Sequence, residues 1–358
     1  MKRHHLRRFF GLSLSIGILL LSSCPAPPEI SLEMSSREVI EQETKGNRKA
    51  VISVGIVQNG QMSFTVYGEN GRVLPDTEYV YEIASITKTF TAQLFARAIS
   101  EGRVNLDDKI DRFLDLPSKK YYPTIKRIFT HTSGYKSTYY HNSGSSIEST
   151  PNFEVFGVGV TKRMLLNTIG AINLKDKDYP CDYSNFAFAV AGLVLENIYN
   201  EDYSSMMNRY LSNDLGLQNT RVNNGKSVNV SNFWAWSEGN PYIPVGALVS
   251  TITDMMKYAQ MQIDGQPSYV SQSHTKLAEA EPPMIFTEND FDIKTDAMGL
   301  AWMMDSAYDV IWHGGNTLYS NSFLGFDKAN RIAAVVLVNM PGQQSRTIGS
   351  AVLRELRR

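Results

Sequence analysis

The chain has 358 residues, of which 42% are hydrophobic and 20% are charged, so it is long and apolar enough to bury a full core in one large domain or two. Its formal net charge is −1 and it contains no basic stripe, which argues against a nucleic-acid partner. The two cysteines, Cys24 and Cys181, are too few for a disulfide framework.

The first 23 residues have the pattern of a bacterial export signal. A basic start leads into an apolar run from Phe9 to Leu21, which is too short for a comfortable membrane span. The ending Leu21-Ser-Ser-Cys24 is similar to the lipobox, in which the cysteine becomes the lipidated first residue of the mature protein. The alternative is a plain signal peptide with an incidental cysteine, and we favour a lipoprotein signal peptide. The proline-rich residues 24–30 would then tether an exported lipoprotein to the periplasmic or extracellular face of a membrane.

Strand and helix patterns follow this tether. Residues 31–45 are polar with a weak amphipathic pattern, which predicts a helix. The β-branched run at 51–57 and the alternating run at 62–67 flank Asn59-Gly60, an arrangement typical of a β-hairpin.

The middle of the chain, from about residue 106 to 280, is mainly helical, and it is preceded by a long amphipathic helix. That first helix opens within residues 81–90 and ends at Glu101-Gly102, where glycine suits a left-handed cap. Apolar periodicity and capping residues predict further helices at 106–114, 124–129, 161–169, 184–199, 202–211 and 251–262. Residues 135–151 lack any periodicity and predict a long loop, and residues 223–239 are polar and irregular.

The tail of the chain changes to a strand period. Strand-like runs occur at 299–304, 310–312, 321–326 and 332–338, before a closing helix at 345–358. Strands thus lie at both ends of the chain with a helical middle between them. We expect an α/β (α+β) fold in which one antiparallel sheet is built from both chain ends, flanked by helices, and carries a mainly helical inserted lobe. A site between sheet and lobe is a common place for a ligand cleft.

Ser85 and Lys88 lie three residues apart at the start of the first long helix, so their side chains share one face of its first turn. A hydroxyl is a poor nucleophile until a base takes its proton, and a lysine can be that base if burial or nearby charge lowers its pKa. The same Ser-x-x-Lys spacing recurs at 133–136 and 273–276, but neither copy opens a strongly periodic helix. We therefore favour Ser85 as the nucleophile.

Two further short motifs lie where the chain turns between elements. Tyr183-Ser-Asn185 precedes the apolar helix at 184–199, and His313-Gly-Gly315 ends an apolar strand. Tyr140-His-Asn142 also fits Tyr-x-Asn, but no helix follows it. For His313, a histidine bound to backbone at a strand end is the structural alternative. The catalytic hypothesis depends on all three motifs occurring in this order.

In this order, the motifs resemble those of the serine β-lactamase and penicillin-binding protein superfamily, in its branch of class C β-lactamases, DD-carboxypeptidases and related esterases. That family carries S-x-x-K, Y-x-N and then K-T-G or H-x-G. The resemblance covers nearly the whole chain after the tether, residues 31–358, with supporting stretches at 83–91, 129–134, 246–251 and 313–316. It implies an α/β sheet with a helical lobe, and acyl transfer without metal or organic cofactor.

The first two motifs carry the catalytic roles that the resemblance implies. Ser85 would attack a carbonyl to form an acyl-enzyme, and Lys88 would take or relay its proton. Tyr183 would act as a general base and pass a proton to the leaving group, which requires its pKa to fall well below about 10 beside the Lys88 charge. Asn185 would hydrogen-bond a substrate amide.

The third motif carries the substrate contacts that the resemblance implies. Backbone N–H groups of Ser85 and Asn316 would form an oxyanion hole. Gly314 and Gly315 would let a substrate backbone approach the strand. His313 would line the site and supply a donor or a positive charge toward a carboxylate.

The chain departs from the family pattern in two places. Its third motif is His-Gly-Gly rather than Lys-Thr-Gly, which resembles the carboxypeptidase and esterase members more than efficient class C β-lactamases. Cys181 stands two residues before Tyr183, where relatives often have an aromatic residue, and we interpret it as a small buried hydrophobic residue. His131 is interpreted as a residue that pins a loop rather than a catalytic group.

These observations predict a membrane-anchored serine hydrolase that acts on a small-molecule or peptide acyl donor. The favoured activity is that of a D-alanyl-D-alanine carboxypeptidase on a peptidoglycan stem peptide. An esterase or a class C-like β-lactamase is the alternative within the superfamily. A non-catalytic penicillin-binding sensor or scaffold is the alternative from another class.

Overall fold

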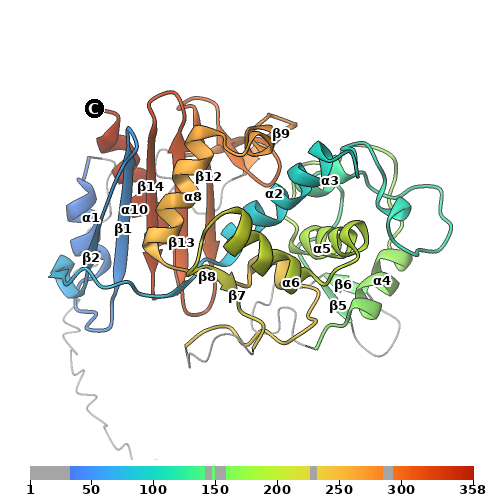
Figure 1. Cartoon of the computed structure of the whole chain (residues 1–358), viewed down its shortest axis with the longest axis horizontal. Coiled ribbons are helices and arrows are strands. Elements are labelled where there is room, and N and C mark those ends of the chain that lie inside the picture. Colours follow the sequence, from blue (N-terminus) through green and yellow to red (C-terminus); the bar gives the residue numbers. More distant parts are fainter. Residues whose placement is uncertain (1–32, 142–146, 150–158, 226–231, 285–292) are drawn as a thin grey trace, which may run out of the picture. The chain divides into compact units, whose positions relative to one another are not determined.

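A computed structural model of the chain describes residues 33–141, 147–149, 159–225, 232–284 and 293–358 (Figure 1). The expected signal peptide, its Cys24 and the tether lie outside the described residues, as does Asn142 of the second Tyr-x-Asn match. Within the described ranges, no helix has the length and apolar character needed to cross a membrane.

A nine-stranded antiparallel sheet forms one side of the molecule, with the strand order β3-β2-β1-β14-β13-β12-β11-β10-β9. The N-terminal part contributes β1 (Ile52–Gln58), β2 (Gln61–Tyr67) and β3 (Val73–Leu74). The C-terminal part contributes β9 (Ala278–Met284), β10 (Thr295–Met298), β11 (Met303–Asp305), β12 (Val310–Asn316), β13 (Asn321–Asp327) and β14 (Ile332–Val338). Strands β1 and β14 pair along their whole length, so the sheet from both chain ends is confirmed.

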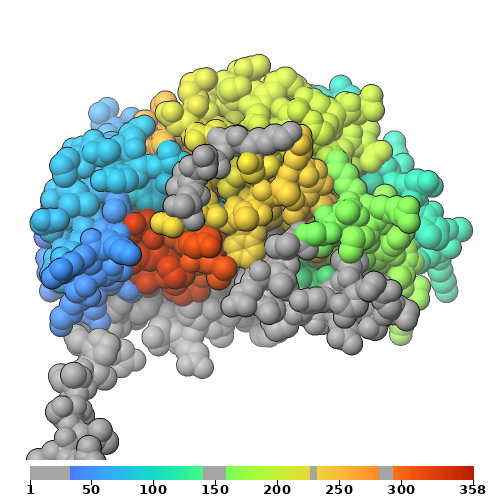
Figure 2. Space-filling view, turned by 90° about the horizontal axis from the view of Figure 1, so that it is seen from below, coloured from blue at the N-terminus to red at the C-terminus, as the bar shows by residue number. Residues whose placement is uncertain are grey.

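Figure 2 shows the consequence on the surface, where the first segments (blue) and the last segments (red) lie side by side and the middle of the chain (green) lies beyond them. The predicted hairpin is also present, because Gln58 pairs with Gln61 across Asn59-Gly60. Both turn residues have positive φ, 50° and 82°, which is the conformation that a two-residue hairpin loop of this type requires.

Helices cover both faces of the sheet (Figure 1). Helix α8 (Ile252–Asp264) packs against β1 and β14 on one face, where Gly55 leaves room for the side chain of Met256. Helix α10 (Gln344–Leu356) packs against β13 and β14, with Phe323 lying against Gly349, and α1 (Ser36–Glu43) packs on α10. Although α8 falls within residues 106–280, it therefore covers the sheet.

The remaining helices gather around α2 (Thr87–Ser100), which is buried along most of its length. Helix α2 contacts α5 (Asn185–Tyr199), α7 (Ile243–Gly246) and α9 (Ser268–Ser273). Helix α5 in turn contacts α3 (Ile125–Phe129) and α6 (Tyr203–Arg209), and α4 (Lys162–Ala171) lies at the far end. Helices α3, α4, α5, α6 and α8 begin where predicted, each with a capping side chain that accepts a backbone N–H: Thr124, Thr161, Ser184, Asp202 and Thr251.

Several expected elements differ from the prediction. Residues 106–114 hold only one 3₁₀ turn, Ile110–Arg112, because their backbone pairs with the next segment: the N–H groups of Ile125 and Lys126 donate to Asp108 and Leu106. The expected loop at 135–151 contains the hairpin β5 (Tyr139–His141) and β6 (Ile147–Ser149).

Two further strand predictions were incomplete. The strand expected at 299–304 starts only at Met303, since Ala301 has φ +64° and the chain bends before it. A small second sheet, β4-β8-β7, was not predicted; it joins β4 (Tyr81–Glu82), β8 (Leu248–Ser250) and β7 (Arg221–Val222). This second sheet leads directly into the turn that carries Ser85.

Candidate active site

Ser85 lies in a 3₁₀ turn, Ala84–Ile86, between β4 and α2, rather than in the first turn of the α-helix itself. Ala84 has φ +46°, a left-handed conformation that is unusual for a residue with a side chain and that is often found at functional turns. The turn is fixed from the sheet, because Ser322 in β13 donates its hydroxyl to the Ile83 carbonyl at 2.8 Å. The half-buried Ser85 is thus presented where sheet and helices meet.

Lys88 is fully buried directly behind Ser85. Its Nζ atom lies 2.9 Å from Ser85 Oγ and 2.9 Å from the Val245 carbonyl oxygen. Burial lowers the pKa of Lys88 well below its usual value of 10.5, because the charged ammonium loses its hydration. The lowered pKa increases the share of neutral amine, whose lone pair can accept the Ser85 proton.

Tyr183 completes the cluster, since its hydroxyl is hydrogen-bonded to the Ser85 side chain and Lys88 Nζ lies 5.0 Å from its ring centre. Burial raises the pKa of Tyr183 above 10. The expectation of a lowered pKa and a tyrosinate is therefore wrong, because desolvation of the buried phenol outweighs any attraction from Lys88. Tyr183 remains a protonated phenol, a donor rather than a base.

His131 holds this tyrosine in place. It is buried, with φ +58°, and its Nδ1 atom accepts the backbone N–H of Ser184 at 3.1 Å. Its ring centre lies 4.6 Å from that of Tyr183. These contacts agree with the interpretation of His131 as a residue that pins a loop.

Asn185 is the first residue of α5, and its Nδ2 group donates to Ser137 Oγ at 3.1 Å. Cys181, four residues earlier, is half-buried rather than fully buried, and its Sγ donates to the Thr130 carbonyl. Desolvation raises the pKa of Cys181 to about 12, so this thiol stays protonated and is a poor nucleophile.

Strand β12 brings the third motif to the opposite side of Ser85. A Cβ atom on Gly315 would lie 2.8 Å from the Ser85 nitrogen and 2.4 Å from the Ile83 oxygen, so only glycine lets the strand lie this close to the Ser85 turn. A Cβ atom on Gly314 would come no nearer than 3.5 Å to other atoms. The steric requirement therefore falls on Gly315, and it concerns the chain's own backbone.

Asn316 ends β12 and is exposed. The Thr317 N–H donates to the Ser320 carbonyl, so residues 317 and 320 form a hydrogen-bonded pair of the antiparallel ladder. Because hydrogen-bonded and non-hydrogen-bonded pairs alternate, the next pair, Asn316 with Asn321, is a non-hydrogen-bonded one. The Asn316 N–H consequently points away from β13, toward the edge of β12 beyond the part that pairs with β11. This is the orientation expected of an oxyanion donor.

His313 is fully buried, and its Nδ1 atom lies 2.6 Å from the Gly314 carbonyl oxygen, to which it can only donate. Desolvation, with a smaller contribution from the Lys88 charge, lowers the pKa of His313 to about 3. The expectation of a positive charge is therefore wrong, because the imidazole is neutral near neutral pH. The alternative of a strand histidine bound to backbone describes its geometry, and the proton on Nδ1 leaves Nε2 as an acceptor.

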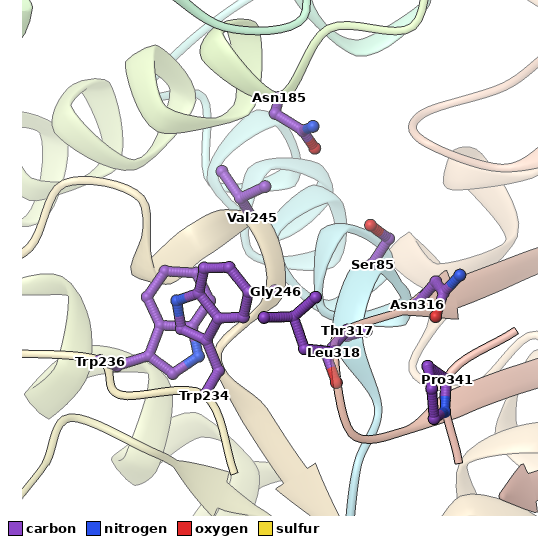
Figure 3. A pocket seen from close by; sticks show the side chains of 11 residues that line it. Ser85, Asn185, Trp234, Trp236, Val245, Gly246, Asn316, Thr317, Leu318 and Pro341 are labelled. Atoms are coloured by element: carbon purple, nitrogen blue, oxygen red, sulfur yellow. The ribbon is translucent and has the colours of Figure 1, made fainter. Parts of the chain in front are cut away.

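Two cavities meet at Ser85, and both are also lined by Asn185 and Asn316. The apolar pocket, of about 240 Å³, is additionally lined by Ala84, Trp234, Trp236, Val245, Gly246, Thr317, Leu318 and Pro341 (Figure 3). The second pocket, of about 280 Å³, is called the polar pocket only because of the Ser, Tyr, His, Gln and Arg side chains at its wall. It is additionally lined by Ser137, Tyr183, Met303, Trp312, His313, Gly314, Gly315, Ser322, Gln343, Ser345 and Arg346. The structure thus brings every predicted site residue except Cys24 to one place.

Several residues that shape the two cavities were not predicted from the sequence. Trp234 and Trp236 lie in a stretch that was judged polar and irregular, although two tryptophans one residue apart in such a stretch are themselves a signal. Arg346 lies in the closing helix, where nothing in the sequence distinguishes it from other surface arginines. Among the described residues, no group of three or more His, Cys, Asp or Glu side chains is arranged to hold a metal ion.

The fold and this cluster are those of a serine hydrolase. The chain belongs to the β-lactamase family, whose family model matches residues 37–357. This match confirms the resemblance inferred from the three motifs.

Curated relatives are distant. The chain is 23% identical over 335 residues to Protein flp of Staphylococcus aureus (strain MRSA252), which is 84% of this chain, and it spans 62% of that protein's length. It is 23% identical over 281 residues to the D-alanyl-D-alanine-carboxypeptidase/endopeptidase AmpH of Escherichia coli (strain K12), covering 72% of this chain and 70% of AmpH. A solved β-lactamase/D-alanine carboxypeptidase from Yersinia pestis, complexed with citrate, has the same fold, with a TM-score of 0.69 at 18% identity over 90% of this chain and 97% of that one.

Proposed function

We propose that this serine hydrolase is a D-alanyl-D-alanine carboxypeptidase that transfers a peptidyl group first to Ser85 and then to water. The observation that carries the proposal is the contact of 2.9 Å between Ser85 Oγ and the buried Lys88 amine, whose pKa is lowered. A lysine with an ordinary pKa would be an ammonium near neutral pH and unable to accept a proton.

In the acylation step, Ser85 Oγ attacks the carbonyl carbon of the scissile bond while Lys88 Nζ takes the hydroxyl proton. The backbone N–H groups of Ser85 and Asn316 donate to the oxyanion that forms. Each such donor is worth about 3 kcal/mol in hydrolases of this kind.

The leaving amine needs a proton, and Tyr183 is placed to give it. The protonated phenol donates to the leaving nitrogen and regains a proton from Lys88, which holds the one taken from Ser85. Tyr183 lines the polar pocket and not the apolar one, so the leaving group departs through the polar pocket. Hydrolysis of the acyl-enzyme reverses these transfers with water in place of the amine.

Arg346 favours a leaving group that carries a carboxylate. It is 6% exposed, lines the polar pocket, and holds its guanidinium 4.8 Å from the Trp312 ring centre, which fixes a positive charge on the leaving-group side. D-Alanine released from a stem peptide has such a carboxylate, whereas a simple alcohol released from an ester has none. The D-alanyl-D-alanine-carboxypeptidase/endopeptidase AmpH and the β-lactamase/D-alanine carboxypeptidase from Yersinia pestis, to which the chain is similar, support this choice.

A panel of acyl donors tests the proposal: a peptide ending in D-Ala-D-Ala, its L-Ala-L-Ala counterpart, a short ester and a chromogenic cephalosporin. We expect release of D-alanine to have the highest kcat/KM, and Ser85→Ala to abolish it. Faster turnover of the ester or the cephalosporin would replace the peptidase assignment by an esterase or a β-lactamase.

A non-catalytic penicillin-binding sensor would give a different result. Incubation with a penicillin followed by mass spectrometry should show an adduct on the peptide that contains Ser85. If no acyl donor left an adduct, the protein would bind without chemistry.

The proposed export and lipid anchor rest on residues 1–24 alone. In a bacterial host, the full chain should lose its first 23 residues and label with a radioactive fatty acid. The Cys24→Ser variant should not label. Labelling of both proteins, or of neither, would contradict an anchor at Cys24.

A further inference from the structure

The apolar pocket lies on the acyl side of Ser85. Tyr183 and His313 line only the polar pocket, so the part of the substrate that receives a proton and leaves must occupy that cavity. The part that stays bonded to Ser85 is then directed into the other cavity, which also begins at Ser85 and Asn185.

The walls of this pocket are apolar and uncharged. Trp234 and Trp236 lie on one side with ring centres 6.1 Å apart, and Leu318 points toward them from the other side (Figure 3). Among the described residues that line it, none is an Asp, Glu, Lys, Arg or His. Its volume of about 240 Å³ exceeds the roughly 150 Å³ in which an engineered apolar cavity holds benzene.

A single carboxylate joins the two walls. Glu82, 1% exposed, accepts the backbone N–H of Trp234 through Oε1 at 2.7 Å and the hydroxyl of Thr317 through Oε2 at 2.7 Å. The Thr317 oxygen in turn accepts the N–H groups of Tyr319 and Ser320, which fixes the turn that carries Leu318. Glu82 lies three residues before Ser85, so the nucleophile and both walls are tied to the same short strand, β4.

We propose that the apolar pocket binds a bulky apolar group on the acyl side of the substrate, and that Glu82 is the positioning residue that sets the distance between its Trp234 wall and its Leu318 wall. The inference rests on the proposed acyl transfer at Ser85, but not on a D-alanine leaving group. It assigns a preference for acyl donors that carry an alkyl or aryl group on the acyl side of the scissile carbonyl over those that carry a charged one.

A series of p-nitrophenyl esters tests this, because the leaving group is constant and only the acyl group grows, from acetate to butyrate to phenylacetate. The wild-type protein should show kcat/KM rising by about 30-fold along the series, as expected when an apolar group fills a hydrophobic pocket. In Trp234→Ala this rise should fall to within about 3-fold. Tyr319→Ala, an exposed aromatic residue in the Leu318 turn that lines neither cavity, should retain the full rise.

Glu82 is tested by a pair of variants. Glu82→Gln keeps the shape and one acceptor, which can hold the Trp234 N–H, but its new amide faces a Thr317 oxygen that already accepts two N–H groups, so the rise should be reduced, although less than in Glu82→Ala. Glu82→Ala should lose most of the rise while still hydrolysing the acetate. A Glu82→Ala protein that lost activity equally on every ester would show a general structural role and overturn the positioning role.

The outcomes separate this inference from the proposed function. Equal kcat/KM for acetate and phenylacetate in the wild type, or an equal rise in wild type and Trp234→Ala, would overturn the pocket assignment even if D-alanine release were observed. Conversely, if kcat/KM rose steeply along the ester series but no D-alanine were released from peptides, the assignment of the apolar pocket would stand and the proposed carboxypeptidase activity would be rejected.

Discussion

The chain contains the Ser-x-x-Lys spacing three times, and the structure places the three copies in different environments. At Ser85 the lysine is fully buried and its Nζ lies 2.9 Å from the hydroxyl. At residues 133–136 and 273–276 the lysine is exposed and pairs with a carboxylate, Asp182 at 3.0 Å and Glu279 at 2.6 Å. The tetrapeptide alone therefore does not make a nucleophile.

The serines differ in the same way. The hydroxyl of Ser133 accepts the Tyr135 N–H, and that of Ser273 donates to the Val270 carbonyl, so each is engaged by its own backbone. The Ser85 hydroxyl instead contacts the Lys88 amine and the Tyr183 phenol, and Ser85 lines two cavities. Burial of the amine beside an accessible hydroxyl distinguishes the reactive copy, and this property depends on helices far away in the sequence.

The largest expected effect comes from removing the three hydroxyls one at a time. Ser85→Ala should lower kcat/KM by about 10⁴-fold or more, because no other group can form the acyl-enzyme. Ser133→Ala and Ser273→Ala should retain activity within about 2-fold and lose roughly 1 kcal/mol of stability, the usual cost of one hydrogen bond. If Ser133→Ala or Ser273→Ala lost as much activity as Ser85→Ala, the three serines would not differ in their catalytic role.

Removing the amines should give the next largest effect. Lys88→Met should lower kcat/KM by about 10³-fold through loss of the base, while its melting temperature stays equal to or above that of the wild type, because an apolar side chain of similar volume costs less to bury than an amine. Lys276→Met removes only an exposed ion pair, worth at most about 1 kcal/mol, and should leave the activity unchanged. Melting curves and ester hydrolysis on the same samples would measure both, and a Lys88→Met protein with ordinary activity would exclude the amine as base.

The features that local sequence determines were predictable. Asn59-Gly60 specified the hairpin, and the capping residues Thr124, Thr161, Ser184, Asp202 and Thr251 marked helix starts. The order of the three motifs was sufficient to name the residues that the structure gathers around Ser85. These signals lie within a few residues of the feature that they specify.

The features that long-range packing determines were not predictable. Strands β4, β7 and β8 are only two or three residues long, too short for any periodicity, and they exist because distant segments pair. The pKa of Tyr183 is raised, opposite to the prediction, because the burial of its phenol, which the sequence does not reveal, outweighs the Lys88 charge, which it does. Glu82 adjoins the Ser85 motif, yet its partners Trp234 and Thr317 are more than 150 residues away.

A pH profile distinguishes the amine from the phenol. The wild-type kcat/KM should rise with pH through an apparent pKa below 10.5, because protonated Lys88 cannot accept the Ser85 proton and its pKa is lowered. Tyr183→Phe should be slower by about 10²-fold, through loss of the proton donor, but its rising limb should lie at the same pH. Ester hydrolysis between about pH 5 and 10 measures both profiles. If the rise of kcat/KM with pH disappeared in Tyr183→Phe, the phenol of Tyr183 would be the base that titrates.

The smallest effect separates burial from catalysis within the third Ser-x-x-Lys copy, where the histidine between serine and lysine is partly buried. His274 packs against Trp302 and Phe326, its Nε2 lies 3.1 Å from Gln262 Oε1, and desolvation lowers its pKa to about 3. The unfolded chain protonates His274 near pH 6.5, whereas the folded chain does so only near pH 3. Protonation therefore favours the unfolded chain between these values, and the free energy of unfolding should decrease as the pH falls from 6.5 toward 3. One such group contributes a slope of up to about 1.4 kcal/mol per pH unit in that window.

His274→Asn should therefore show a weaker loss of stability between pH 6.5 and 4 than the wild type, measured by urea unfolding at each pH. Lys276→Met, which alters the exposed end of the same segment, should keep the wild-type slope. Ester hydrolysis at pH 7.5 should be unchanged in both variants, since neither residue lines a cavity at Ser85. If His274→Asn and Lys276→Met lost stability equally as the pH fell, burial would not lower the pKa of a side chain in the third copy as it lowers that of Lys88 in the first. The two copies would then differ only in the environment of their lysines.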